Sequence, residues 1–149
     1  MKIAIASDHG GFDLKAPIAE QLRGLGHEVF DLGAHARDPD DDYPDFARYV
    51  AQALQHDQAD RGIILCGSGV GASIAANKHK GVRASVCHDP YTARQGVEHD
   101  DMNVLCLGAR VIGPELAGVV VEAFARASFS AQERHQRRVD KVNAIESAN

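Results

Sequence analysis

The chain has 149 residues, enough for one domain with a substantial core and too few for two full domains, so we expect a single domain over residues 1–149. Hydrophobic residues make up 44% of the chain and charged residues 25%, which is typical of a globular protein and argues against a disordered or membrane-spanning one. The formal net charge of -5 argues against a nucleic-acid partner, because a phosphate backbone attracts clustered basic surfaces.

Short apolar runs alternate with longer stretches of helical period along the chain. The runs predict strands over residues 2–6, 28–32, 62–66, 82–87 and 103–107, and the longer stretches predict helices over 12–25, 43–55, 70–77, 90–99 and 114–127. Residues 37–45, rich in aspartate and proline, indicate a long loop. The first apolar run turns polar at Asp8 and is too short for a signal peptide or a membrane span, so we expect a cytoplasmic protein without a membrane partner.

A last helix signal follows these elements. Ser130 and Glu133 have the spacing of a capping box, in which each side chain satisfies a free backbone amide of the other, so a C-terminal helix is expected to start there. The alternation of helices with strands that are apolar on both faces predicts an α/β fold. We expect a Rossmann-like three-layer sandwich, with a five-stranded parallel sheet covered by helices on both sides.

A glycine-rich loop follows the third predicted strand. In a parallel sheet, ligands bind at the carboxyl ends of the strands, where these loops begin. The segment Gly67-Ser68-Gly69-Val70-Gly71 lets backbone amides turn toward an anion at a helix N-terminus, so a phosphate or an oxyanion fits there. The alternative is a tight turn that binds nothing.

Spacing tests three specific versions of such a loop. A Walker loop needs Lys and then Ser or Thr after its last glycine, whereas Ala-Ser follows here. A cysteine phosphatase needs an arginine that closes the loop behind Cys66, and no arginine occurs before Arg83. The looser dinucleotide pattern fits Gly67-x-Gly69-x-x-Ala72 with Asp89 further on, so a dinucleotide-binding protein stays open as an alternative.

The three cysteines, Cys66, Cys87 and Cys106, lie far apart in apolar segments, which argues against a disulfide framework and against a thiolate metal site. Cys66 differs from the other two because it ends a strand beside the glycine loop, where a partly positive helix terminus can activate a thiol. We predict that Cys66 carries chemistry and that Cys87 and Cys106 are small buried hydrophobic residues.

Other polar residues stand at element ends. Asp8 and His9 directly follow the first strand, which places them beside a ligand over the glycine loop if the first and third strands are neighbours. Asp8 could also cap the helix that starts near Phe12. His99 lies in a polar segment before the fifth strand, where acidic neighbours suit proton transfer near neutral pH, and the alternative is an exposed helix-end histidine.

The last predicted helix carries basic residues at three- and four-residue spacing: Arg134, Arg137, Arg138 and Lys141. Such a stripe can grip a phosphate or form a solvated face. Val139, Val142 and Ile145 supply part of an apolar face, so this helix can dock against the body of the protein or against a second subunit.

With these segments the chain resembles the type B ribose-5-phosphate isomerases, in the wider family that includes galactose-6-phosphate isomerase subunits. The resemblance covers nearly the whole chain. Its main motifs are, in order, Ser7-Asp8-His9-Gly10-Gly11, Asp42-Tyr43-Pro44-Asp45, Cys66-Gly67-Ser68-Gly69-Val70-Gly71, Ile74-Ala75-Ala76-Asn77-Lys78, Asn103-Val104-Leu105 and Arg134-His135-Gln136-Arg137-Arg138. Several motifs in the right order are more specific than one glycine loop.

The resemblance implies that the chain interconverts ribose 5-phosphate and ribulose 5-phosphate through an enediolate, without a cofactor or a metal. It also implies a homodimer, or a dimer of dimers, whose sites draw on both subunits. Cys66 resembles the base that moves a proton between C2 and C1, and His99 resembles the acid that opens the furanose ring. Asp8 would assist ring opening, and Ser68 would help to move the hydroxyl proton.

The resemblance also implies which residues bind the substrate. The loop amides of Gly67, Ser68, Gly69, Val70 and Gly71 would stabilise the enediolate. The phosphate would be bound by His9, Arg110, Arg134 and Arg138. Tyr43 and Asp100 complete the predicted substrate-binding set. The chemistry agrees with this set, because moving a carbon-bound proton needs a base and hydrogen-bond donors aimed at the developing negative oxygen.

One position departs from the family pattern. The residue after the ring-opening histidine is usually asparagine, and here it is Asp100. An asparagine amide can donate to an enediolate, whereas a carboxylate donates only when protonated. The alternatives are therefore an isomerase of allose 6-phosphate, galactose 6-phosphate or a tetrose phosphate, and a non-catalytic phosphosugar-binding protein.

Overall fold

Helices and strands alternate in the computed structural model, which describes residues 1–148. The elements, in chain order, are β1 (Lys2–Ser7), α1 (Phe12–Gly24), β2 (Glu28–Asp31), α2 (Tyr43–Gln55), β3 (Arg61–Cys66), α3 (Val70–Ala76), β4 (Ala84–Val86), α4 (Pro90–Asp100), β5 (Val104–Gly108), α5 (Pro114–Arg126) and α6 (Glu133–Ser147). Each predicted strand and helix is present. Only residue 149 of the predicted domain lies outside the described residues.

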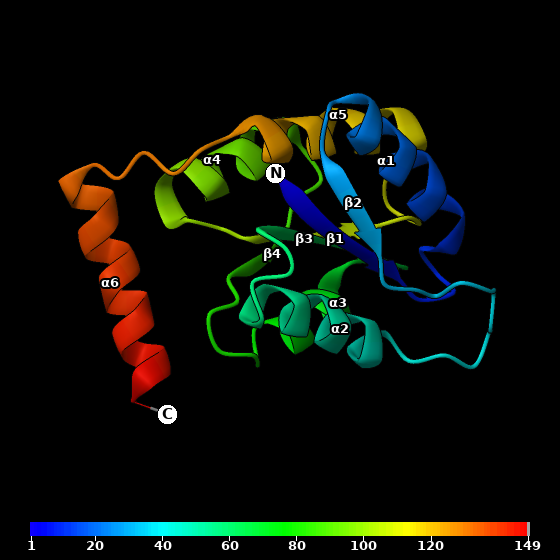
Figure 1. Ribbon diagram of the computed structural model, residues 1–149, viewed down its shortest axis with the longest axis horizontal. Coiled ribbons are helices and arrows are strands. Elements are labelled where there is room, and N and C mark those ends of the chain that lie inside the picture. Colours follow the sequence, from blue (N-terminus) through cyan, green and yellow to red (C-terminus); the bar gives the residue numbers. More distant parts are fainter. Residues whose placement is uncertain (149) are drawn as a thin grey trace.

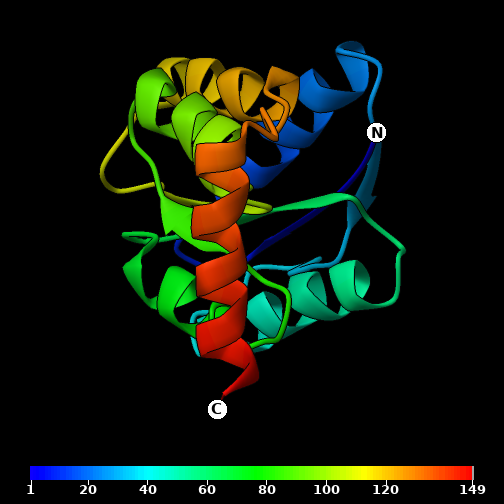
Figure 2. The same cartoon turned by 90° about the vertical axis from the view of Figure 1, so that its left-hand side faces the viewer.

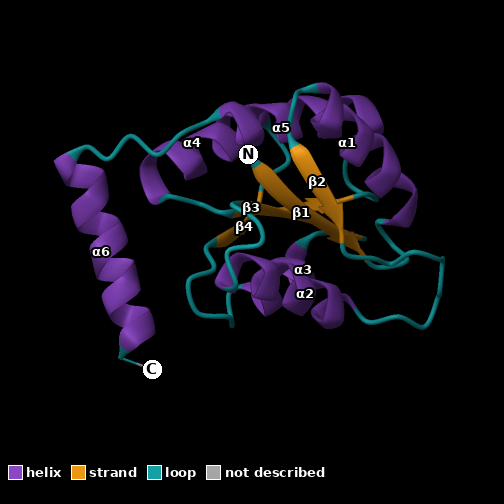
Figure 3. Ribbon diagram, viewed as in Figure 1, coloured by secondary structure: helices purple, strands orange, loops and turns teal. Residues whose placement is uncertain are grey.

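The strands form one parallel sheet in the order β2-β1-β3-β5-β4. Successive side chains of a strand point to opposite faces, and both faces of the central strands are apolar. In β1, Ile3 and Ile5 join the core under α1, α4 and α5, whereas Ala4 and Ala6 join the core against α2 and α3. Figure 3 shows the three layers, with the strands between two groups of helices. The predicted α/β fold with a five-stranded parallel sheet is confirmed.

The strand β4 is shorter than the predicted range of residues 82–87. Its ladder with β5 covers only Ala84–Val86. Immediately before it, the backbone N–H of Arg83 donates to the side-chain oxygen of Asn103 at 2.8 Å. This side-chain bond takes the place of a ladder bond, so the regular pairing starts one residue later.

The helix α6 lies outside the three layers. In Figure 1 it stands at the left, below the end of α4, on the opposite side of the molecule from the long loop between β2 and α2. Figure 2 shows it crossing the open edge of the sheet, from the layer of α4 and α5 to the layer of α2 and α3. Only His135 and Val139 of this helix are buried. Within residues 1–148, no helix combines the length and the apolar composition needed to cross a bilayer.

The capping box predicted at the start of α6 is wrong. The helix begins at Glu133, and its N-cap residue, Gln132, makes no side-chain cap hydrogen bond. The hydroxyl of Ser130 instead hydrogen-bonds Nδ1 of His135 at 2.6 Å. Because His135 is buried, this bond satisfies a ring nitrogen that would otherwise be unpaired, which favours it over a cap in solvent.

Arg61 connects the start of β3 to the end of α5. Its guanidinium donates to the carbonyls of Phe124 at 2.6 Å and Ala127 at 2.7 Å, which lack helical partners at a helix C-terminus. We expect Arg61→Met to lower the free energy of unfolding by about 2–3 kcal/mol, because these carbonyls lose a charged donor. Urea unfolding measures the change. Arg126→Met, which removes only an exposed ion pair with Glu122, is the control and should change the stability by less than about 1 kcal/mol.

Candidate active site

The loops that follow β1, β3 and β5 converge at the carboxyl edge of the sheet. The strands β1 and β3 are neighbours, as are β3 and β5. A Cβ atom added to Gly10 would lie 2.8 Å from the backbone nitrogen of Gly67, so the first two loops touch. The backbone N–H of Arg110 donates to the carbonyl of Gly67 at 3.0 Å. Residues far apart in the sequence therefore meet around the glycine loop.

Cys66 ends β3 and is buried, with 4% of its surface exposed. The backbone N–H of Gly69 donates to its Sγ at 3.0 Å. Gly69 adopts a φ of 83°, in the left-handed region that favours glycine, and this turns its amide toward the sulfur. An amide donor aimed at sulfur stabilises negative charge there, as a thiolate base requires.

The rest of the glycine loop leaves backbone donors available. The hydroxyl of Ser68 accepts the N–H of Val70 at 3.2 Å. No hydrogen bond within residues 1–148 uses the amides of Ser68 and Gly71. The ring of Tyr43, at the start of α2, lies over Gly71, where an added Cβ would be 2.6 Å from Tyr43 Cζ. Glycine is thus required at residue 71 for the close approach of this ring.

The other two cysteines are buried in the core. Cys87 is 3% exposed and Cys106 is fully buried, and the structure shows all three cysteines as free thiols. Burial raises the pKa of the Cys87 and Cys106 thiols, which keeps them protonated. The prediction that they are buried hydrophobic residues is confirmed by their positions.

Asp8 and His9 lie side by side at the end of β1. Asp8 is 6% exposed, and its Oδ1 accepts the N–H of Gly11 at 3.1 Å. Gly11 is the N-cap residue of α1 and the helix has no side-chain cap, so the predicted capping of α1 by Asp8 is wrong. Asp8 instead closes the tight turn before the helix. Burial raises the pKa of the Asp8 carboxyl, and the hydrogen bond that the backbone N–H of Gly11 donates to it partly offsets this rise.

Asp41, which the sequence did not single out, joins this pair. Its Oδ1 lies 2.7 Å from Nδ1 of His9. Ligand atoms of Asp8, His9 and Asp41 lie within 4.8 Å of one another, a spacing that could hold a metal ion. Two of these ligand atoms already take part in hydrogen bonds within the protein: His9 Nδ1 with Asp41, and Asp8 Oδ1 with the N–H of Gly11.

Arg110 adds a cation at the same edge. It follows β5, and its guanidinium packs against Gly67, where an added Cβ would lie 3.4 Å from Nη1. In the part of the chain that the structure describes, its guanidinium makes no hydrogen bond or ion pair. His9 is close enough for the charge of Arg110 to act on its pKa. An unpaired guanidinium beside an imidazole is an arrangement that can bind a phosphate.

His99 lies elsewhere, in the last turn of α4. Its Nδ1 lies 3.0 Å from the side-chain nitrogen of Gln95, and its ring stacks on that of His135 at 4.0 Å between centroids. Burial lowers the pKa of His135, and the nearby His99, Arg134 and Arg138 lower it further. The predicted phosphate ligands Arg134 and Arg138 are exposed on α6, next to this histidine pair.

The structure does not bring His99 to Cys66 within one chain. The helix α4 runs from the carboxyl end of β4 back to the amino end of β5, so His99 stands at the amino edge. Cys66 pairs with Gly108 at the carboxyl end of β5, and the five residues of that strand span about 13 Å at 3.3 Å per residue. The predicted site residues thus form two separate groups in one chain.

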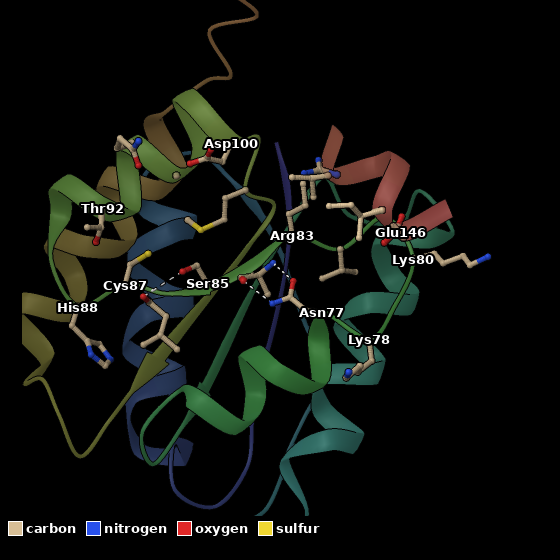
Figure 4. Close-up of a pocket in the computed structure, with 18 of the residues that line it drawn as sticks. Asn77, Lys78, Lys80, Arg83, Ser85, Cys87, His88, Thr92, Asp100 and Glu146 are labelled. Carbon is tan, nitrogen blue, oxygen red and sulfur yellow. Dashed lines mark hydrogen bonds between the residues drawn. The ribbon is translucent and has the colours of Figure 1, made fainter. Parts of the chain in front are cut away.

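A groove of about 1200 Å³ is lined by residues of β4, α4 and α6. Figure 4 shows Asp100 on α4, Arg83 before β4 and Glu146 on α6 at its border. Of the predicted site residues, only Asp100 lines it. Val142, which is 52% exposed, contributes an apolar side chain from α6. The groove therefore borders the histidine group and not the cysteine loop.

Comparisons with known proteins show the family of this chain. Residues 3–142 match the family model described as ribose/galactose isomerase. The chain is 47% identical over 145 residues to ribose-5-phosphate isomerase B of Escherichia coli, covering 97% of this chain and 96% of that one. It is 41% identical over 129 residues to D-erythrulose-4-phosphate isomerase of Pectobacterium atrosepticum, covering 87% and 85%.

A solved structure is also similar. Ribose-5-phosphate isomerase B from Mycoplasma genitalium with bound ribulose-5-phosphate is 43% identical and superposes with a TM-score of 0.93. The match covers 99% of this chain and 97% of that chain. The two chains thus share the whole fold.

Proposed function

Because the chain belongs to the ribose/galactose isomerase family, we propose that it interconverts ribose 5-phosphate and ribulose 5-phosphate, and that residues 1–149 form one isomerase domain. The family and its close relatives make it an aldose-ketose isomerase of sugar phosphates. One observation carries the proposal. The buried Cys66 thiol accepts a hydrogen bond from a loop amide. It shares the carboxyl edge of the sheet with the imidazole of His9 and the unpaired guanidinium of Arg110.

In the proposed reaction, Cys66 acts as the base. Its thiolate removes the proton from C2 of the open-chain aldose, and the electron pair moves through an enediolate to the carbonyl oxygen. The same thiol returns the proton to C1, which gives the ketose. The free amides of Ser68 and Gly71 donate to the negative oxygens, and the Ser68 hydroxyl helps to move the hydroxyl proton.

The substrate phosphate lies over the loops after β1 and β5. His9 and Arg110 supply two donors from the same chain as Cys66, and the phosphate compensates for their mutual repulsion. Arg134 and Arg138, exposed on α6, supply further donors from a second chain. Tyr43 covers the glycine loop and limits the height of the site above Gly71.

Ring opening requires a homodimer in this proposal. His99 and Cys66 stand at opposite edges of one sheet, so an intact site takes Cys66 from one chain and the partner's His99. Exposed apolar side chains support such an interface, with Val70 53% and Ile74 60% exposed on α3 beside the glycine loop. A two-fold symmetric pair forms two equivalent sites. Asp100, next to His99, enters the site from the same chain as the histidine.

A second candidate substrate is a tetrose phosphate. Asp100 replaces the asparagine that the family usually has, and one relative is named for D-erythrulose 4-phosphate. A carboxylate near the enediolate changes which hydroxyl groups the site can bind, because it accepts hydrogen bonds and donates none when ionised.

The test is the rate of ketose formation with EDTA present. We expect ribose 5-phosphate to give a higher kcat/KM than erythrose 4-phosphate or allose 6-phosphate. A higher value for another sugar would contradict the proposed substrate and leave the reaction type intact. Thermal stabilisation by ribose 5-phosphate without turnover would indicate a binding protein, and stabilisation by NAD alone would indicate a dinucleotide-binding protein.

A further inference from the structure

Asp41 holds His9 through a single carboxylate oxygen. Oδ1 accepts the backbone N–H of His9 at 2.9 Å and lies 2.7 Å from the ring Nδ1. The side chain of Asp41 is 11% exposed and that of His9 is 33% exposed. The second oxygen of Asp41, Oδ2, is buried and has no hydrogen-bond partner within residues 1–148. His9 is therefore the main partner of this carboxylate.

The loop that carries Asp41, residues 32–42, is anchored to the end of β1. The backbone N–H of Ala34 donates to the carbonyl of Ser7 at 2.8 Å. The buried Lys15 donates through Nζ to the carbonyl of Ala34 at 2.5 Å. These bonds fix the beginning of the loop beside β1, and the two bonds from His9 to Asp41 fix its end.

A proton on Nδ1 determines what the other ring nitrogen can do. In a neutral ring, Nε2 then carries a lone pair that repels a phosphate oxygen, whereas in the cation Nε2–H donates to it. The hydrogen bond that the His9 ring donates to Asp41 is the largest cause that raises the pKa of His9, and the charge of Asp8 adds to it. Burial and Arg110 act in the opposite direction. The Arg37 guanidinium also lies nearby, donating to the His9 carbonyl at 3.3 Å.

We propose that Asp41 is a positioning residue for phosphate binding: its carboxylate accepts the backbone N–H and faces Nδ1 of His9, which orients the ring and favours its protonated form, so that Nε2–H donates to the substrate phosphate beside Arg110. The proposal rests on the proposed function, in which His9 and Arg110 bind that phosphate. A phosphate ester is mainly a dianion above about pH 6. The cationic ring therefore meets the dianion between about pH 6 and the raised pKa of His9, and binding weakens as the pH rises through that pKa.

The first test follows the titration of the His9 ring by NMR in the full-length protein, with the signal assigned by its loss in His9→Gln. Asp41→Asn keeps an oxygen that accepts both N–H groups and removes the charge. We expect the His9 titration to move to lower pH in Asp41→Asn and in Asp41→Ala. Asp40→Asn removes an exposed charge from the same loop and should leave the titration unchanged. An unchanged titration in Asp41→Asn would overturn the proposal.

The second test compares KM for ribose 5-phosphate at two pH values. In Asp41→Asn we expect KM to rise by up to about tenfold at a pH between the two His9 titration midpoints that the first test gives, to stay close to wild type below both midpoints, and kcat to change little. If Asp41 only holds the loop and the ring in place, Asn can do the same, and the effect on KM should not depend on pH. An equal ratio of variant KM to wild-type KM at both pH values would therefore contradict the role of the charge. If wild type turns over no sugar phosphate, the proposed function fails, and the titration still decides whether Asp41 controls His9.

Discussion

Cys66→Ala is expected to lower kcat for ribose 5-phosphate by about 10³-fold and to leave KM nearly unchanged, because the variant loses the base and keeps the phosphate ligands. The buried Sγ of Cys66 lies at the carboxyl edge of the sheet and accepts a hydrogen bond from the backbone N–H of Gly69. A steady-state assay of ketose formation in EDTA measures both constants. Stability should change modestly, since the substitution removes one sulfur atom from a packed loop.

Cys106→Ala is the matched control for this variant. Cys106 is fully buried and packs in the same part of the core as Cys66, on the neighbouring strand β5. The control removes the same atom from the same environment but leaves the glycine loop intact. We expect its kcat to stay near wild type. If Cys66→Ala keeps full activity, or if both variants lose activity equally, Cys66 is not the base.

Mixing two inactive variants is expected to restore activity. Cys66→Ala and His99→Asn each lack one half of every site, and a mixed dimer contains one site with both defects and one intact site. Random pairing makes half of the dimers mixed, and one of their two sites works, so about a quarter of the wild-type activity should return. The two variants are unfolded together, refolded and assayed, with each variant alone treated in the same way.

The control for the mixing experiment is Cys66→Ala with Arg110→Ala, assayed below KM. Both residues lie at the carboxyl edge of the same chain, so each site takes its Cys66 and its Arg110 from one chain. A mixed dimer of these two variants therefore has no site in which both residues are intact. Each site of that mixed dimer contains one of the two defects, and we expect no restoration. If Cys66→Ala and His99→Asn also fail to restore activity while forming mixed dimers, the shared site is wrong.

The positions of the main elements were predictable because they depend on local sequence. Apolar runs followed by glycine or polar residues mark strand ends, and the strand ending at Cys66 and its glycine loop were predicted in this way. Local patterns failed at Ser130. The spacing of a capping box was present, but the buried His135, five residues further on, took the hydroxyl as its partner.

Asp41 shows a second limit of local reasoning. It is one of several aspartates between residues 38 and 45, and nothing in the spacing distinguishes it from Asp40 or Asp42. Its role depends on the path of the loop beside β1, which brings its carboxylate to His9 across 32 residues of sequence. Such contacts follow from sheet order and loop anchoring, and these are not encoded in a short window of residues.

The sequence by itself determined the α/β class, the parallel sheet, the position of the glycine loop after Cys66 and the family, because periodicity, turn chemistry and motif order are local properties of the chain. Only the tertiary structure decided that His9 pairs with Asp41 and that His99 lies at the opposite edge from Cys66. The direction of a helix relative to its sheet follows from packing the whole core. The residues of one predicted site could therefore be named in advance, while their division between two edges could not.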